Sequence, residues 1–153
     1  QAFAVDAASA LAAAHALSQM CEKCPLAAMV VAQSGALEAA LAVVRSRNVS
    51  VAHRRAREEC WSLLHNIADS NPVTHERLWG AGIVACAMEL LSRDAARERR
   101  VRELLIAFLC ALSFNEENRY RLLTTVPLLV RELHPTAGDH LPRGGDRSGV
   151  PGG

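Results

Sequence analysis

Aromatic residues are scarce in this chain of 153 residues: they make up only 4% of it, although half of all residues are apolar. Valine and isoleucine are not arranged in alternating runs, so the pattern of a half-buried β-strand is missing. Alanine and leucine dominate instead. Alanine loses no side-chain entropy in a helix and lets helix backbones approach each other. The composition therefore predicts closely packed helices and no sheet.

The chain also lacks a run of 18 uninterrupted apolar residues and the flanks of a signal peptide. Its formal net charge is only +1, so no global field attracts nucleic acid or acidic membranes. The five cysteines are an odd number, whereas a secreted disulfide scaffold has an even, denser set. We expect an intracellular protein, cytoplasmic or nuclear, without a membrane span.

Metal-binding and catalytic patterns are missing as well. Cys21 and Cys24 have the spacing of half a zinc site, but no second Cys or His pair accompanies them. Cys60, Cys86 and Cys110 are expected to be small core hydrophobes. We therefore predict no metal and no other cofactor.

The histidines form no Ser-His-Asp or Cys-His arrangement, and no phosphate-binding glycine loop occurs. We expect most of the histidines to be polar surface or groove residues. The prediction is a protein that is not an enzyme and has no small-molecule substrate. The six histidines are His15, His53, His65, His75, His134 and His140.

The most informative feature of the chain is an internal repeat. A shift of 47 positions places residues 17–20 (Leu-Ser-Gln-Met) on residues 64–67 (Leu-His-Asn-Ile), and Pro25 on Pro72. A third copy is present in looser register, with Leu109 placed 45 residues after the leucine at position 64. Self-similarity at a period in the forties is typical of stacked helical units.

Each copy is predicted to contain three helices. In the second copy a long helix includes residues 61–68, a short one spans 72–81, and a third spans 82–91 and opens at a glycine. Asn71 is suited to cap the short helix, with the next residue, a proline, at its first position. Asn115 precedes two glutamates that suit the positive end of a helix.

These motifs resemble the armadillo repeat, whose long third helix ends in leucine–polar–asparagine–leucine–alanine. In that family this helix is succeeded by a turn, a short helix, a glycine turn and a helix ending in paired leucines. Segments similar to these elements are found at residues 64–68, 71–72, 81–83 and 90–92. The resemblance covers roughly residues 5–134. It implies an all-α fold, a right-handed superhelical solenoid of about three armadillo-like repeats.

The first and third copies depart from the family pattern. Gln19 stands in place of the asparagine, and Thr124 and Thr125 replace glycines. Because the chain begins on a third helix and ends on a second, we interpret residues 1–134 as a fragment of a longer array or a truncated gene model. The isolated chain is expected to self-associate or to be marginally stable. The Pro- and Gly-rich residues 135–153 are predicted to be a disordered tail.

The resemblance also implies a binding surface. In armadillo proteins that bind extended peptides, the asparagine that matches Asn66 lies on the concave face and holds the ligand backbone through its amide. We therefore predict that a protein or extended peptide binds along the concave face of the three long helices, and that Arg55 favours an acidic ligand. The alternative is that Asn66 is a relic of the fold. The candidate residues are Asn66, Ser62, Arg55, Gln19 and His15.

Two basic stretches contain interleaved acidic residues, a pattern that favours solvated helix faces with internal ion pairs. The alternative is one basic stripe along the stacked long helices. Nucleic acid is not expected as a ligand, because interleaved aromatic residues are missing. The stretches comprise Arg45, Arg47, Arg54, Arg55 and Arg57, and then Arg97, Arg99, Arg100 and Arg102.

Together these features predict a non-catalytic protein-interaction module. Two alternatives stay open. One is a structural scaffold segment that stacks on further repeats, and the other is a regulatory or substrate-docking part of a larger enzyme.

Overall fold

The computed structural model describes residues 6–92 and 98–133, and every regular element in these two ranges is a helix. The predicted all-α class is therefore confirmed for the described part of the chain. The predicted tail over residues 135–153 lies outside it.

The helices are arranged along the chain in three sets, and each set opens with its longest helix. The first set contains α1 (Ala7–Cys21), α2 (Pro25–Gln33) and α3 (Ala36–Arg45). The second contains α4 (Val51–Ser70), the 3-10 helix η1 (Pro72–Thr74), α5 (His75–Gly80) and α6 (Ile83–Ser92). The third contains α7 (Arg99–Ser113), α8 (Glu116–Arg121), the 3-10 helix η2 (Leu123–Thr125) and α9 (Val126–Leu133).

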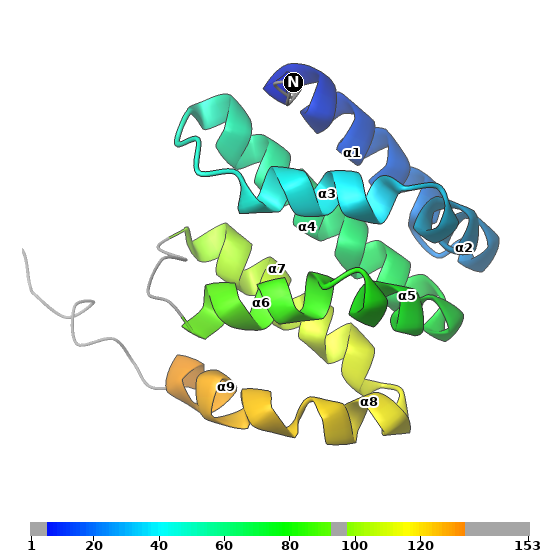
Figure 1. Cartoon of the computed structure of the whole chain (residues 1–153), viewed down its shortest axis with the longest axis vertical. Helices are drawn as coiled ribbons and strands as arrows, with labels where there is room; N and C mark the ends of the chain where they lie inside the picture. The colour runs from blue at the N-terminus through cyan, green and yellow to red at the C-terminus, as the bar shows by residue number, and fades with distance from the viewer. Residues whose placement is uncertain (1–5, 93–97, 134–153) are drawn as a thin grey trace, which may run out of the picture.

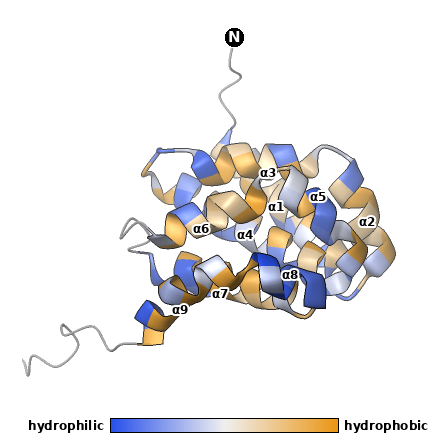
Figure 2. Cartoon of the chain, turned by 60° about the horizontal axis from the view of Figure 1, so that its bottom comes forward, coloured by the Kyte–Doolittle hydropathy of each residue, from blue (hydrophilic) through white to orange (hydrophobic). Residues whose placement is uncertain are grey.

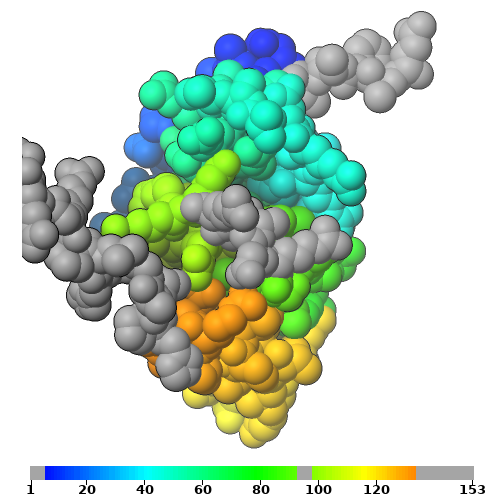
Figure 3. Space-filling model, turned by 90° about the vertical axis from the view of Figure 1, so that its left-hand side faces the viewer, coloured from blue at the N-terminus to red at the C-terminus, as the bar shows by residue number. Residues whose placement is uncertain are grey.

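We call α1, α4 and α7 the long helices, α2, α5 and α8 the short helices, and α3, α6 and α9 the closing helices. The long helices lie side by side, with α4 packed against both α1 and α7. The closing helices form a second layer, and the short helices lie along one edge (Figure 1). The first and third sets are at opposite ends of the molecule, as Figure 3 also shows.

The boundaries of the second set are explained by its capping and turn residues. The side chain of Asn71 accepts a hydrogen bond from the Val73 backbone N–H at 3.0 Å, and Pro72 begins η1, so this predicted cap is confirmed. The predicted short helix is divided into η1 and α5. Before α6, Gly82 has a φ of +77°, a conformation that residues with a side chain rarely adopt.

The third set begins and turns differently. Asn115 caps α8 by accepting from the Glu117 N–H at 3.0 Å, in agreement with the prediction. At the corner before α9, where glycines are missing, the chain forms η2. There the Thr125 hydroxyl donates to the Leu122 carbonyl at 2.6 Å.

The core runs continuously through the three sets. Its largest side chains are Trp61 of α4 and Phe108 of α7, which are fully buried, with their ring centroids 5.8 Å apart. This aromatic contact joins the second set to the third. No single helix among the described residues is long and apolar enough to cross a membrane, and α2 and α3 pass that test only as a pair bent by 75°.

Candidate partner-binding face

The three long helices enclose a hollow of about 370 Å³ on the surface that they form together. We call this surface the long-helix face. Its hollow is lined by residues of the long helices alone. They are Leu11 of α1, then Arg55, Glu58, Glu59 and Ser62 of α4, and Arg100 and Leu104 of α7.

Two arginines reach the hollow from neighbouring helices. Arg55 and Arg100 are 45 residues apart, which is the offset between the second and third copies in the sequence, and both are exposed. Arg100 lies 3.6 Å from a carboxylate oxygen of Glu103, whereas Arg55 has no ion pair with any residue that the structure describes. Arg100 was not among the predicted site residues, although the offset of 45 identifies it as the counterpart of Arg55.

His15 and Glu59 meet beside the hollow. The Nδ1 atom of His15 lies 2.7 Å from a carboxylate oxygen of Glu59, so the pair connects α1 to α4. The side chain of His15 is 61% exposed, and such solvent-exposed pairs contribute at most about 1 kcal/mol to stability. The pair therefore fixes the position of one carboxylate in the hollow more than it stabilises the fold.

The structure places Asn66 in a contact between helices. Its side-chain Nδ2 donates to the backbone carbonyl of Ser18 at 3.1 Å and to the Ser18 hydroxyl at 3.0 Å. The hydroxyl of Ser62 lies 3.3 Å from that of Ser18. The predicted amide group is thus engaged within the chain and holds α4 to α1. Gln19, its counterpart on α1, is exposed.

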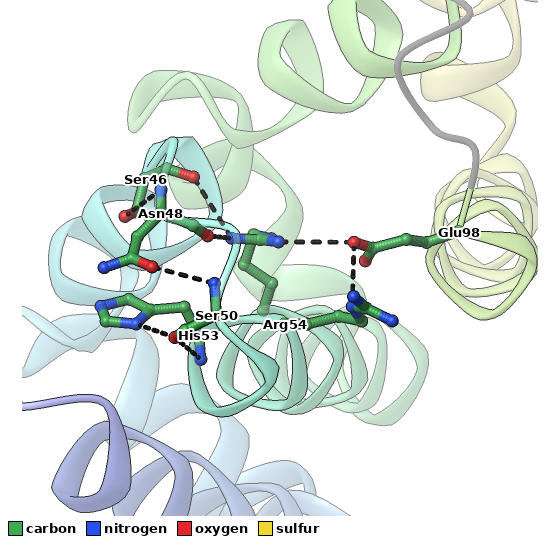
Figure 4. Close-up of polar contacts among 7 residues, drawn as sticks. Ser46, Asn48, Ser50, His53, Arg54 and Glu98 are labelled. Atoms are coloured by element: carbon green, nitrogen blue, oxygen red, sulfur yellow. Dashed lines mark hydrogen bonds and ion pairs between the residues drawn. The ribbon is translucent and has the colours of Figure 1, made fainter.

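Most of the other arginines in the two basic stretches form internal ion pairs. Glu98, which precedes α7, lies 3.4 Å from Arg54 and 3.5 Å from Arg57 (Figure 4). Arg57 also donates to the backbone carbonyl of Asn48 at 2.6 Å, and Arg102 pairs with Glu132. Arg97 lies outside the described residues. These pairs agree with the interpretation of solvated, internally paired helix faces, and a continuous basic stripe is not present in the described residues.

A larger hollow of about 680 Å³ is lined by residues of α3, α4, α6 and α7, and its half-buried arginine is engaged within the chain. Arg57 lines it and is occupied by its contacts with Glu98 and the Asn48 carbonyl. Burial raises the pKa of the Cys86 thiol, and the positive charge of Arg45 opposes that rise. The hollow also borders residues 93–97, which the structure does not describe. We therefore place the candidate site on the long-helix face.

The cysteines differ in their surroundings. Cys60 and Cys86 are core residues, as predicted, and burial raises the pKa of the Cys60 thiol to about 12. Cys110 was expected in the core but is exposed, because the side of α7 on which it lies is not covered by a described helix. Cys21 is buried and Cys24 is exposed. Among the described residues, no group of three His, Cys, Asp or Glu side chains is placed to hold a metal ion.

His75 is the exception among the described histidines, because it is buried and not a polar surface residue. Its Nε2 lies 2.9 Å from the carbonyl of Ala68, which can only accept, so Nε2 carries the proton and Nδ1 accepts from Asn118 at 2.7 Å. The Asn118 side-chain oxygen in turn accepts from the indole N–H of Trp79 at 2.9 Å. This chain of bonds joins α5 to α8 and has a structural role.

Comparisons of the chain with protein-family models, with curated proteins and with solved structures find no match. Function is therefore inferred from the geometry of the long-helix face. Two guanidinium groups from successive helices, beside serine and carboxylate groups, can form charge-assisted hydrogen bonds with the acidic side chains of another molecule.

Proposed function

We propose that the chain is an armadillo-like array of three units, wound as a right-handed superhelix, and that it is a non-catalytic module that binds another protein. The recurrence of the three sets in the same helix order supports the array. The sequence offsets of 47 and 45 residues support it independently.

The observation that carries the binding proposal is the pair Arg55 and Arg100. Both are exposed, occupy corresponding positions of α4 and α7, and line one hollow. Packed helices have axes about 8–10 Å apart. An extended peptide in the polyproline II conformation brings every third side chain to the same side, about 9 Å apart. The ligand is therefore an extended segment with two acidic residues three positions apart.

A fluorescently labelled peptide of glycine, serine and proline, with two glutamates three positions apart, tests this proposal by fluorescence anisotropy at low ionic strength. We expect Arg55→Ala and Arg100→Ala each to weaken binding by roughly fivefold, which is the loss of one partly exposed charge contact of about 1 kcal/mol. Arg99→Ala is the matched control, because the side chain of Arg99 is 93% exposed and pairs with Glu103. It should leave binding unchanged.

The proposed ligand geometry is rejected if adjacent glutamates bind as well as spaced ones. The proposed site is rejected if Arg99→Ala weakens binding as much as Arg100→Ala. Binding by neither peptide would reject the acidic ligand itself.

Asn66→Ala separates the two roles of that residue. If Asn66 holds a ligand backbone, as the resemblance implies, the variant should bind the peptide at least about tenfold more weakly while keeping its stability. The bonds to Ser18 instead favour a loss of about 1 kcal/mol in the free energy of unfolding with little change in affinity. Urea denaturation and anisotropy on the same variant distinguish these outcomes.

A second candidate function is a scaffold segment whose main contacts are at its two ends. It is favoured by the internal engagement of Asn66 and by the uncovered apolar surface next to α9.

A further inference from the structure

The third set has an apolar surface that no other part of the described chain covers. The closing helices α3 and α6 contain four and five buried residues, whereas no residue of α9 is buried. Beside α9 lies a hollow of about 300 Å³ with a mainly apolar lining, where hydrophobic parts of α7 and α9 come together (Figure 2). We call it the α7–α9 groove. Ile106 and Leu109 of α7 and Val126 of α9 contribute to it.

This groove lies where a further long helix fits. Ile106 and Leu109 come 45 residues after Trp61 and Leu64, and these two residues of α4 are fully buried. Trp61 is covered by Phe108 of the next long helix. In the third set Ile106 is half-buried and lines the groove, whereas Leu109 is buried and forms part of its floor. The groove is thus the counterpart of the surface on which α7 packs in the middle of the chain.

The opposite end of the molecule presents a matching helix face. Leu63 and Ile67 of α4, and Phe108 and Leu112 of α7, are buried at positions 45 residues apart. Their counterparts on α1, 47 residues before α4, are Ala16 and Met20, and both are exposed. Met20 is 59% exposed. Because the side chain of Ala16 is small, another helix can approach this face of α1 closely.

We propose that a second copy of the chain docks head to tail, with the outer face of α1 from one copy in the α7–α9 groove of the other. The outer face of α1 corresponds to the faces by which α4 packs on α1 and α7 packs on α4. The α7–α9 groove corresponds to the surfaces that receive those faces. The contact joins different surfaces on the two copies, so association continues into longer assemblies unless the rotation closes a ring. This inference rests on the proposed array but not on the proposed peptide ligand.

Residues 134–153 are a poor alternative occupant. They contain six glycines, three prolines and only two large apolar residues, Leu141 and Val150. Such a segment has no apolar stripe to place in the groove. A second copy, by contrast, contains a helix whose outer face is already of the required kind.

Two variants of the full chain test the proposal by sedimentation velocity over a wide range of concentrations. Met20→Arg blocks the α1 face, and Cys110→Arg blocks the groove, where Cys110 is exposed. The parent chain should sediment faster as its concentration rises, whereas each variant alone should remain a monomer. An equimolar mixture of the two variants should form a dimer of twice the monomer mass and nothing larger, because each variant retains the surface that the other lacks.

Val73→Arg is the matched control, because Val73 is 73% exposed in the second set, away from both ends. It should associate like the parent chain. Helical content is checked by circular dichroism, and if either variant loses it, Ala13→Arg and Val126→Arg replace the first pair. Association must also persist in Arg55→Ala, so that failure of the peptide proposal and failure of this one are distinguishable.

A parent chain that stays monomeric at every concentration would overturn the proposal. A mixture of variants that forms no dimer would overturn it as well. If Met20→Arg abolishes association and Cys110→Arg does not, the contact is a symmetric one between two α1 faces, and the head-to-tail arrangement is wrong.

Discussion

The closing helices of the second and third sets are both rich in apolar residues, but they differ in burial. Of the residues in α6, five are buried, including Ile83 and Leu91, whereas α9 contains no buried residue despite its two valines and three leucines. The difference lies in the neighbouring helices, because α7 packs against α6 and no described helix packs against α9 in that way. In this molecule a closing helix is buried by the long helix of the next set.

The largest effect that tests this comparison is expected for a core residue at the contact of the second and third sets. Phe108→Ala removes a fully buried ring next to Trp61 and should lower the free energy of unfolding by about 3–5 kcal/mol. Val130→Ala in α9, where the residue is 45% exposed, should cost less than about 1 kcal/mol. Urea denaturation measures both, at a concentration low enough for the chain to be a monomer. Equal losses would mean that α9 is covered within the monomer.

A smaller effect is expected at the polar contact between the short helices of the two sets. Asn118→Ala leaves the buried Nδ1 of His75 and the indole N–H of Trp79 without their partner. The expected loss is about 2–3 kcal/mol.

Asn115→Ala in the same set removes only an exposed cap and should cost about 1 kcal/mol. Thermal unfolding of the two variants ranks them. If Asn115→Ala is the more damaging, the bonds between α5 and α8 do not contribute as the geometry indicates.

The corner before the closing helix gives a third test. Gly82→Ala should cost about 1–2 kcal/mol, because φ at this position is +77°. Gly80 has ordinary backbone angles and open space around it. Gly80→Ala should therefore raise stability, by about 0.5 kcal/mol. The two variants, measured in urea, should differ in the sign of their effect, and equal signs would contradict the role of the left-handed turn.

The smallest effect concerns the thiols of the two sets. Burial raises the pKa of Cys60 from 9.0 to about 12, so the folded state binds more protons than the unfolded state between these pH values. The contribution of this thiol to the free energy of unfolding should therefore be fully present below pH 9. It should fall as the pH rises, by about 1 kcal/mol near pH 9.5. Cys60→Ala should flatten this part of the pH profile. Cys110→Ala, which changes an exposed thiol, should leave the profile unchanged.

The sequence was sufficient for the elements whose signals are local. Proline after Asn71, glycine at position 82 and the helical spacing of leucines located the short and closing helices of the second set to within a few residues, whereas the start of α4 at Val51 was not predicted. The burial of His75 and the exposure of Cys110 were not predictable in the same way. The first depends on Asn118, 43 residues away, and the second on the lack of a described helix over α7.

For the candidate site, Arg55, Ser62 and Glu59 occupy one face of α4, as helical spacing alone implies. The hydrogen bonds of Asn66 could not be predicted, because Ser18 belongs to another helix, and its carbonyl, which also accepts from the Glu22 N–H at 3.1 Å, is in reach of Asn66 only when α1 packs on α4.

The bonds between sets have a mechanical consequence. Along the short-helix edge the sets are joined by close hydrogen bonds, such as Asn71 to Pro25 at 3.0 Å and Trp79 to Asn118 at 2.9 Å. At the opposite edge Glu98 lies 3.4 Å from Arg54 and 3.5 Å from Arg57, and Arg131 of α9 donates to the backbone carbonyl of Leu91 in α6. The second and third sets are therefore joined at both edges, and rotating one set against the other would break hydrogen bonds or ion pairs at one edge or the other. Because Arg55 and Arg100 extend from α4 and α7, these bonds also hold the spacing of the two backbone positions that carry them.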